Sequence, residues 1–163
     1  MRARVKTRRQ RMDSDIAKVL LIAVKEEVLR ALPQFRVSAQ AKRRLDFEWQ
    51  ASTGLFYKAA VRIMDDTDRF VVNVWWSTAR KAAWSGGADP EVARATPDRG
   101  VSLARLCFRG YGFVPSWAVG EPDPSPARKN DMTFPTAEAA AKDVASKLVE
   151  FAMPFLESSG PSK

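Results

Sequence analysis

The feature that most constrains the fold is a change in hydrophobic period near residue 33. Between residues 14 and 32, apolar side chains recur every three or four positions, which places them on one face of a helix. Asp13 or Ser14 can cap this helix, and Pro33 ends it because proline disfavours helical backbone in the residue before it. From residue 45 the period becomes two, since "LDFEWQ" alternates apolar and polar side chains as a half-buried strand does. The chain therefore passes from an amphipathic helix into a sheet.

Two further strands follow the first. Residues 55–64 and 69–76 show the same alternation, and the short turns "STG" and "DDTD" separate the three strands. Parallel neighbours need a crossover of about a dozen or more residues, so connections this short predict an antiparallel meander.

The second half of the chain is less periodic. Residues 77–84 and a segment capped by Asp89 fit short helices, residues 101–108 fit a fourth strand, and the residues around Trp117 fit a fifth. The proline-rich stretch 120–131 is typical of an exposed loop.

An alanine-rich stretch within residues 134–157 predicts a closing helix, which Pro154 ends or kinks. Each long helix has one apolar stripe, so both helices can cover the same sheet. We therefore expect an α+β domain, an antiparallel sheet of about five strands with the N- and C-terminal helices packed on one face. The length of 163 residues suits one domain, placed at 13–158 between a disordered basic arm (1–12) and a disordered tail (159–163).

No apolar run approaches the roughly 20 residues that span a bilayer, and the cleavage site of a signal peptide is missing. We expect a cytoplasmic protein without a membrane role. Edge strands of the sheet can pair across a twofold axis, so both a monomer and a homodimer are consistent with the pattern.

The formal net charge of +8 lies almost entirely in the arm. Six of the 27 Lys and Arg residues precede Met12, which leaves 21 against 19 acidic residues, or +2, for the rest of the chain. Such an arm can bind nucleic-acid phosphates without sequence preference, but it has no aromatic residue on which a base could stack. We favour an idle arm, with Met12 as an alternative start. The six residues are Arg2, Arg4, Lys6, Arg8, Arg9 and Arg11.

The chain has no histidine and one cysteine. These counts exclude an internal disulfide, the Ser-His-Asp and Cys-His arrangements, and the transition-metal sites that depend on histidine. Arg105 and Arg109 flank Cys107 and could lower its pKa, but we interpret Cys107 as a small buried hydrophobe. We expect no catalytic residue, no metal and no cofactor.

Two groups of charges have ordinary structural interpretations. The aspartates of "DDTD" (Asp65, Asp66 and Asp68) are turn residues between strands, without the glycine and glutamate of a calcium loop. Asp46 and Glu48 share one face of their strand, opposite Lys58 and Arg62 of the next. We predict cross-strand ion pairs on a solvated face, worth a few tenths of a kcal/mol each.

The five tryptophans are more informative. Adjacent Trp75 and Trp76 must point to opposite faces of their strand, so one of them lies under local structure or on a surface that a partner covers. Exposed aromatic residues are enriched at binding hot spots. The candidate binding surface consists of Trp75, Trp76, Trp84, Trp117 and Tyr111, whereas "RGYGF" (109–113) is interpreted as a glycine bend.

The stretches "GLFYKAAVRIMDDTDRFVVNVWW", "SWAV" and "FPTAEAAAKDVASKLVEFAMPFLE" follow the capped first helix. In this order they resemble a family of small bacterial α+β domains of unknown function, some found near toxin–immunity loci. The resemblance spans roughly residues 14–157 and depends on the "RFVVNV" and "AMPFLE" motifs. It implies a binding or immunity-like role and brings no catalytic residues.

From these observations we expect a bacterial intracellular protein that is not an enzyme and binds another protein, in an immunity-like or accessory role. Two alternatives stay open: a nucleic-acid-associated protein that uses the basic arm, and a small-ligand-binding domain with an aromatic pocket. A pocket that gathers Trp and Tyr around a desolvated carboxylate would favour a ligand site or an enzyme.

Overall fold

The structure is a computed structural model, and it describes residues 8–64, 68–77 and 101–159. The short helices expected between residues 78 and 96 lie outside this part of the chain. In order, the elements are α1 (Arg8–Ala31), β1 (Arg36–Ala41), β2 (Arg44–Gln50), β3 (Phe56–Ile63), β4 (Arg69–Ser77), β5 (Val101–Ser102), α2 (Leu103–Cys107), β6 (Trp117–Val119), a 3-10 turn (Pro126–Arg128), β7 (Met132–Phe134), α3 (Ala137–Lys147), a π-helical turn (Leu148–Ala152) and α4 (Met153–Ser159).

The strands form one mixed sheet in the order β1-β2-β3-β4-β6-β7, with the short β5 paired to β4. All pairs are antiparallel except β6 with β7. The predicted meander corresponds to β2, β3 and β4, so the mixed helix-and-sheet class and the antiparallel pairing are confirmed. The seven strands exceed the five expected, because β1 and β7 occupy segments in which we predicted no strand.

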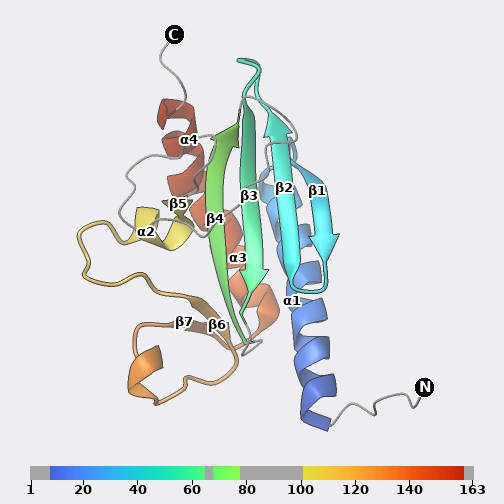
Figure 1. Cartoon of the computed structure of the whole chain (residues 1–163), viewed down its shortest axis with the longest axis vertical. Helices are drawn as coiled ribbons and strands as arrows, with labels where there is room; N and C mark the ends of the chain where they lie inside the picture. The colour runs from blue at the N-terminus through green and yellow to red at the C-terminus, as the bar shows by residue number, and fades with distance from the viewer. Residues whose placement is uncertain (1–7, 65–67, 78–100, 160–163) are drawn as a thin grey trace.

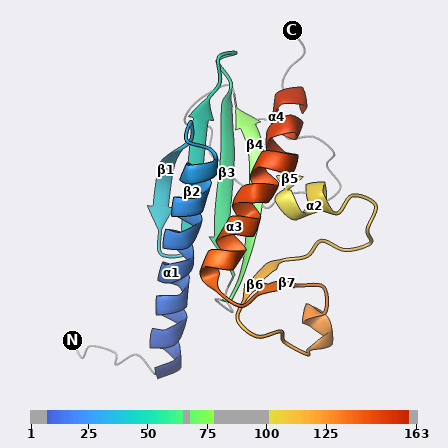
Figure 2. The ribbon, with the colours of Figure 1, turned by 180° about the vertical axis from the view of Figure 1, so that it is seen from behind.

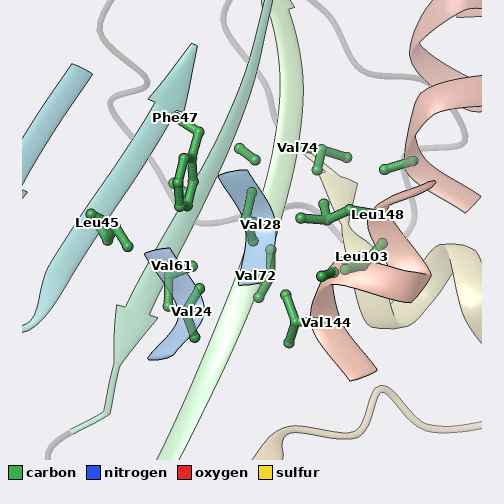
Figure 3. Packing of buried hydrophobic residues seen from close by; sticks show 14 of the residues in the cluster. Val24, Val28, Leu45, Phe47, Val61, Val72, Val74, Leu103, Val144 and Leu148 are labelled. Atoms are coloured by element: carbon green, nitrogen blue, oxygen red, sulfur yellow. The ribbon is translucent and has the colours of Figure 1, made fainter. Parts of the chain in front are cut away.

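The long helices lie side by side behind the sheet in Figure 1 and in front of it in Figure 2. In the register of the meander, Leu45 lies opposite Val61 and Phe47 opposite Ala59, and all four point to the same face because side chains alternate along a strand. Figure 3 shows this face meeting the helices. The buried contact is built from Leu45, Phe47, Val61, Val72 and Val74 of the sheet, Val24 and Val28 of α1, Val144 of α3, Leu148 of the π-helical turn and Leu103 of α2.

The predicted start of the first helix is wrong. Helix α1 begins at Arg8 and not at residue 14, so residues 8–12 of the predicted disordered arm are helical. Arginine, glutamine and methionine all have high helix propensity, which lets the helix continue through Asp13 and Ser14. At the other end of the chain, of the two predicted effects of Pro154 the structure excludes an end of the helix and shows a local distortion instead. The preceding turn widens into a π-helix, in which the N–H of Met153 donates to the Leu148 carbonyl, and α4 continues.

The predicted fourth strand at 101–108 is mostly helix. Only Val101 and Ser102 pair with β4, after which the chain turns into α2. Ser102 caps this helix, since its hydroxyl accepts a hydrogen bond from the N–H of Arg105 at 3.4 Å. Leu103, Ala104 and Leu106 are buried on this short helix. A short apolar run of this kind fits a buried strand and a buried helical turn equally well, which explains the wrong prediction.

An arginine attaches the proline-rich stretch 120–131 to the sheet. Arg128 contacts Asp131 (Nε–Oδ2, 2.8 Å), Asp68 (Nη2–Oδ2, 2.9 Å) and Asp123 (Nη1–Oδ2, 3.3 Å), and Asp131 also pairs with Arg69 of β4. Burial acts against the charge of Arg128, but the hydrogen bonds and charges of Asp131 and Asp68 outweigh it and raise its pKa above the usual value. The stretch is therefore held against β4 by part-buried ion pairs.

No helix in the described part of the chain is both long and apolar enough to cross a membrane.

Candidate binding surface

The structure places the predicted site residues in very different surroundings. Trp75, Trp76 and Trp117 are buried, so the prediction that they form an exposed surface is wrong. Trp84 and residues 2, 4 and 6 lie outside the described residues, and Arg8, Arg9 and Arg11 are described only as helical backbone. Tyr111 is exposed over 56% of its surface.

Each buried tryptophan has a structural role in the sheet. Trp76 lies opposite Tyr57 on the helix side, whereas Trp75 lies opposite Lys58 on the other side. Trp117 stacks on Phe70 with ring centroids 5.9 Å apart, and its indole N–H donates to Asp143 of α3 at 2.9 Å. A large amphipathic ring is stabilised by such contacts, which is why tryptophan is usually well buried.

Tyr111 belongs to a loop that begins at the end of α2. The N–H of Phe108 donates to Ala104, and the N–H of Tyr111 donates to Phe108 at 3.2 Å. This closes a four-residue turn in which Gly110 has a φ of +84°. A positive φ at the third position is the requirement of a type II turn, and glycine meets it without strain. The turn places Phe108 and Tyr111, its first and fourth residues, close together.

We call Phe108, Tyr111 and Phe113 the aromatic cluster. Tyr111 lies edge-on to Phe108 (5.7 Å, 85°) and to Phe113 (5.7 Å, 65°), and Phe108 is 6.5 Å from Phe113. Edge-to-face contacts of this kind stabilise a ring pair by about 0.5–1.5 kcal/mol beyond their burial. Phe113 and Val114 are also exposed, so three large side chains within residues 111–114 reach the surface. The cluster is thus a preformed apolar surface.

Two arginines flank the aromatic cluster. The Nη1 of Arg105 donates to the backbone carbonyl of Tyr111 at 3.4 Å, and the guanidinium of Arg109 lies 5.7 Å from the ring centroid of Phe155 in α4. Both contacts orient the side chain without neutralising it. Among the described residues neither arginine makes an ion pair, whereas Arg36, Arg44 and Arg62 all do.

The opposite face of the sheet carries the charges that we expected to be solvated. The predicted cross-strand pairs are present: Glu48 contacts Lys58 (Oε2–Nζ, 3.2 Å) and Asp46 contacts Arg62 (Oδ1–Nη1, 2.6 Å). The expectation of a solvated face is wrong, because the side chains of Glu48 and Lys58 are only 4% and 9% exposed. The alternation of residues in the sequence predicts which side chains share a face of the sheet, but it does not predict whether other parts of the chain cover that face.

Burial alone would raise the pKa of Glu48, and hydrogen bonds and charges from Arg36 and Lys58 outweigh it, so the pKa lies below its usual value. A carboxylate that stays ionised is not a proton donor near neutral pH. The arrangement is that of a structural ion pair. Among the described residues, no group of Asp, Glu or Cys is arranged to hold a metal ion, and Asp68 of the "DDTD" turn faces Arg128.

Cys107 lies at the end of α2, half-buried. Burial raises the pKa of its thiol to about 11, with the charge of Lys147 opposing this effect and those of Asp143 and Glu150 adding to it. The flanking arginines therefore do not activate it, and the interpretation of Cys107 as a structural residue holds.

We expect the thiol of Cys107 to react about 100-fold more slowly with iodoacetamide at pH 8 than the same thiol in the urea-unfolded chain, because a pKa of about 11 in place of 9.0 lowers the thiolate fraction by that factor. The measurement is the rate of carbamidomethylation by mass spectrometry over a pH series. Equal rates in the folded and unfolded chains would show that the thiol is unperturbed.

Sequence reasoning missed Phe108, Phe113, Arg105 and Arg109 as site residues. Their signal was present in "FRGYGFVP", where aromatic residues alternate with glycines and a proline follows. Glycine and proline disfavour a helix or a strand through this segment. Its large apolar residues therefore lie in a loop and not on the buried face of a regular element. Comparison with protein-family models, curated proteins and solved structures finds no match to the chain.

Proposed function

We propose that the chain is a bacterial, cytoplasmic protein-interaction module without enzymatic activity, and that the aromatic cluster is its binding surface. An immunity-like or accessory role is the form of this function that the sequence resemblance implies. The observation that carries the proposal is the exposure of Tyr111 and Phe113 in a loop whose turn and ring contacts already fix their positions.

Preformed exposed rings suit protein binding for two reasons. A partner that covers Tyr111 and Phe113 removes a large apolar area from water, and such aromatic residues carry much of the binding energy at interfaces. The Gly110 turn and the ring contacts fix the loop before binding, which reduces the ordering cost that a partner has to overcome.

The test uses the full chain against displayed random-sequence peptides, followed by affinity measurements with synthetic copies of the selected peptides. We expect Tyr111→Ala to weaken binding by about 30-fold, the effect of removing a hot-spot side chain worth about 2 kcal/mol. Val19→Ala is the matched control, because Val19 on α1 is also 56% exposed.

We expect the unfolding curve of Val19→Ala to be unchanged within about 0.5 kcal/mol. Tyr111→Ala should lose about 1–3 kcal/mol, because it removes the two ring contacts to Phe108 and Phe113, so binding is compared under conditions in which both variants are folded. Selected peptides that bind Tyr111→Ala as tightly as the natural chain would contradict the proposal. A selection that yields no specific peptide would contradict it as well.

A further inference from the structure

We infer that the segment recognised by the aromatic cluster is an acidic one, with Asp or Glu next to an apolar anchor residue. This inference assumes the proposed function and adds the chemistry of the partner. It depends on Arg105, whose guanidinium donates to the Tyr111 carbonyl, and on Arg109, which lies in the turn that joins Phe108 to Tyr111. Neither arginine has a carboxylate partner among the described residues.

The guanidinium groups of the two arginines are not compensated within the described part of the chain. The carboxylates that act on the neighbouring Cys107 are those of Asp143 and Glu150. Asp143 is paired with Lys147 (Oδ1–Nζ, 2.5 Å) and accepts the Trp117 N–H. Glu150 is exposed, and among the described residues neither carboxylate forms an ion pair with either arginine. A partner that brings carboxylates would supply the missing negative charges.

Both guanidinium groups are held in place before a partner arrives. Arg105 is half-buried, with one N–H on the Tyr111 carbonyl and its Nε buried without a hydrogen-bond partner. Arg109 is exposed and lies over the Phe155 ring. A planar guanidinium with free N–H groups binds a carboxylate by donating two parallel hydrogen bonds, and little ordering is needed when the side chain is already oriented.

The ring geometry favours a peptide over a single-stranded nucleic acid, which would also bring negative charge. Nucleic-acid platforms present ring faces on which successive bases stack. Here Tyr111 is edge-on to both Phe108 and Phe113, so the rings use their edges and faces on one another and form a compact apolar surface. Such a surface fits an aliphatic or aromatic side chain.

The experiment takes the peptides selected on the full chain and compares each with a copy in which every Asp and Glu is replaced by Asn and Gln. We expect the selected peptides to be acidic and the neutral copies to bind at least about tenfold more weakly. Affinity should also fall with added salt. Arg109→Gln should weaken binding of the acidic peptides by about tenfold, with a smaller loss for Arg109→Lys, which keeps the charge without the planar fork. The matched control is Lys18→Gln, which removes one exposed positive charge on α1.

The outcomes separate the two claims. Peptides that depend on Tyr111 but are neutral, or are indifferent to Arg109→Gln, would overturn the acidic partner and leave the binding surface intact. Peptides whose affinity is unchanged by both Tyr111→Ala and Arg109→Gln would overturn the proposed function as well. The inference would be overturned in favour of single-stranded nucleic acid if an oligothymidylate displaced the peptides and bound Tyr111→Ala and Arg109→Gln more weakly than the natural chain.

Discussion

We expect Lys58→Met to lower the free energy of unfolding by about 3 kcal/mol or more, although methionine keeps most of the packing volume of lysine. The substitution leaves Glu48, whose side chain is 4% exposed, with one fewer positive neighbour in a buried setting. Removing one partner of a buried ion pair costs about 3–5 kcal/mol, because the remaining charge is desolvated without full compensation. The measurement is urea unfolding at neutral pH, with Lys129→Met as the control at an exposed lysine.

A double substitution tests whether the buried charge is the cause. In Glu48→Leu/Lys58→Met no charge of this pair is left uncompensated, and Arg36, whose side chain is 59% exposed, can turn to solvent. We expect the double variant to regain most of the loss, since hydrophobic replacement of a whole buried pair is often neutral or stabilising. If the two substitutions instead added their separate losses, the pair would not be coupled in the way the structure indicates.

The pH dependence of stability has a definite sign. The pKa of Glu48 is lower in the folded chain than its ordinary value of about 4.5, so the folded state binds fewer protons than the unfolded state in that range. The stabilisation is fully present above pH 4.5 and is lost as the pH falls through the folded pKa. Glu48→Gln removes this part of the acid sensitivity, and its stability should therefore decline less steeply below pH 4.5 than that of the natural chain.

The second large effect is expected at Arg128. Arg128→Met should lower the free energy of unfolding by about 3 kcal/mol, because Asp131 (side chain 6% exposed) would keep only Arg69 as a positive partner and Asp68 would lose its contact. Arg128→Lys should recover part of this loss, since a single ammonium cannot reach the three carboxylates that the guanidinium fork contacts.

The matched control for Arg128 is Arg30→Met. Arg30 pairs with Glu27 at 2.6 Å, but its side chain is 67% exposed, so we expect a change within about 0.5 kcal/mol. Thermal unfolding of the three variants gives the ranking. An Arg128→Met variant as stable as Arg30→Met would show that stretch 120–131 is not held by these ion pairs.

Much of the fold was predictable from local pattern. The meander of β2, β3 and β4 has clean alternation and short turns, and both properties are set by neighbouring residues. The segment 101–108 was assigned to the wrong element, because eight mostly apolar residues fit a strand and a buried helical turn equally well. β7 is three residues long and pairs in parallel with β6, so it leaves no periodic signal in the sequence.

The candidate site was predictable only through Tyr111. The chemistry of the tryptophans favours a binding surface, but the sheet buries Trp75, Trp76 and Trp117. Trp117, for example, combines a stack on Phe70 with a hydrogen bond to Asp143. The aromatic cluster depends on one turn at Gly110 that directs three rings together. Turn geometry of this kind follows from backbone angles that residue type only suggests.

The sequence by itself determined the presence of the first and last long helices, the antiparallel meander and the residues that share each face of it, because these follow from hydrogen-bond geometry and side-chain direction over a few neighbouring residues. Tertiary structure alone decided that Glu48 and Lys58 are buried, that Arg128 reaches Asp68 across 60 positions, and that Phe108, Tyr111 and Phe113 meet at the surface. Burial is a property of what packs against a face, and the packing segments are far apart in the chain.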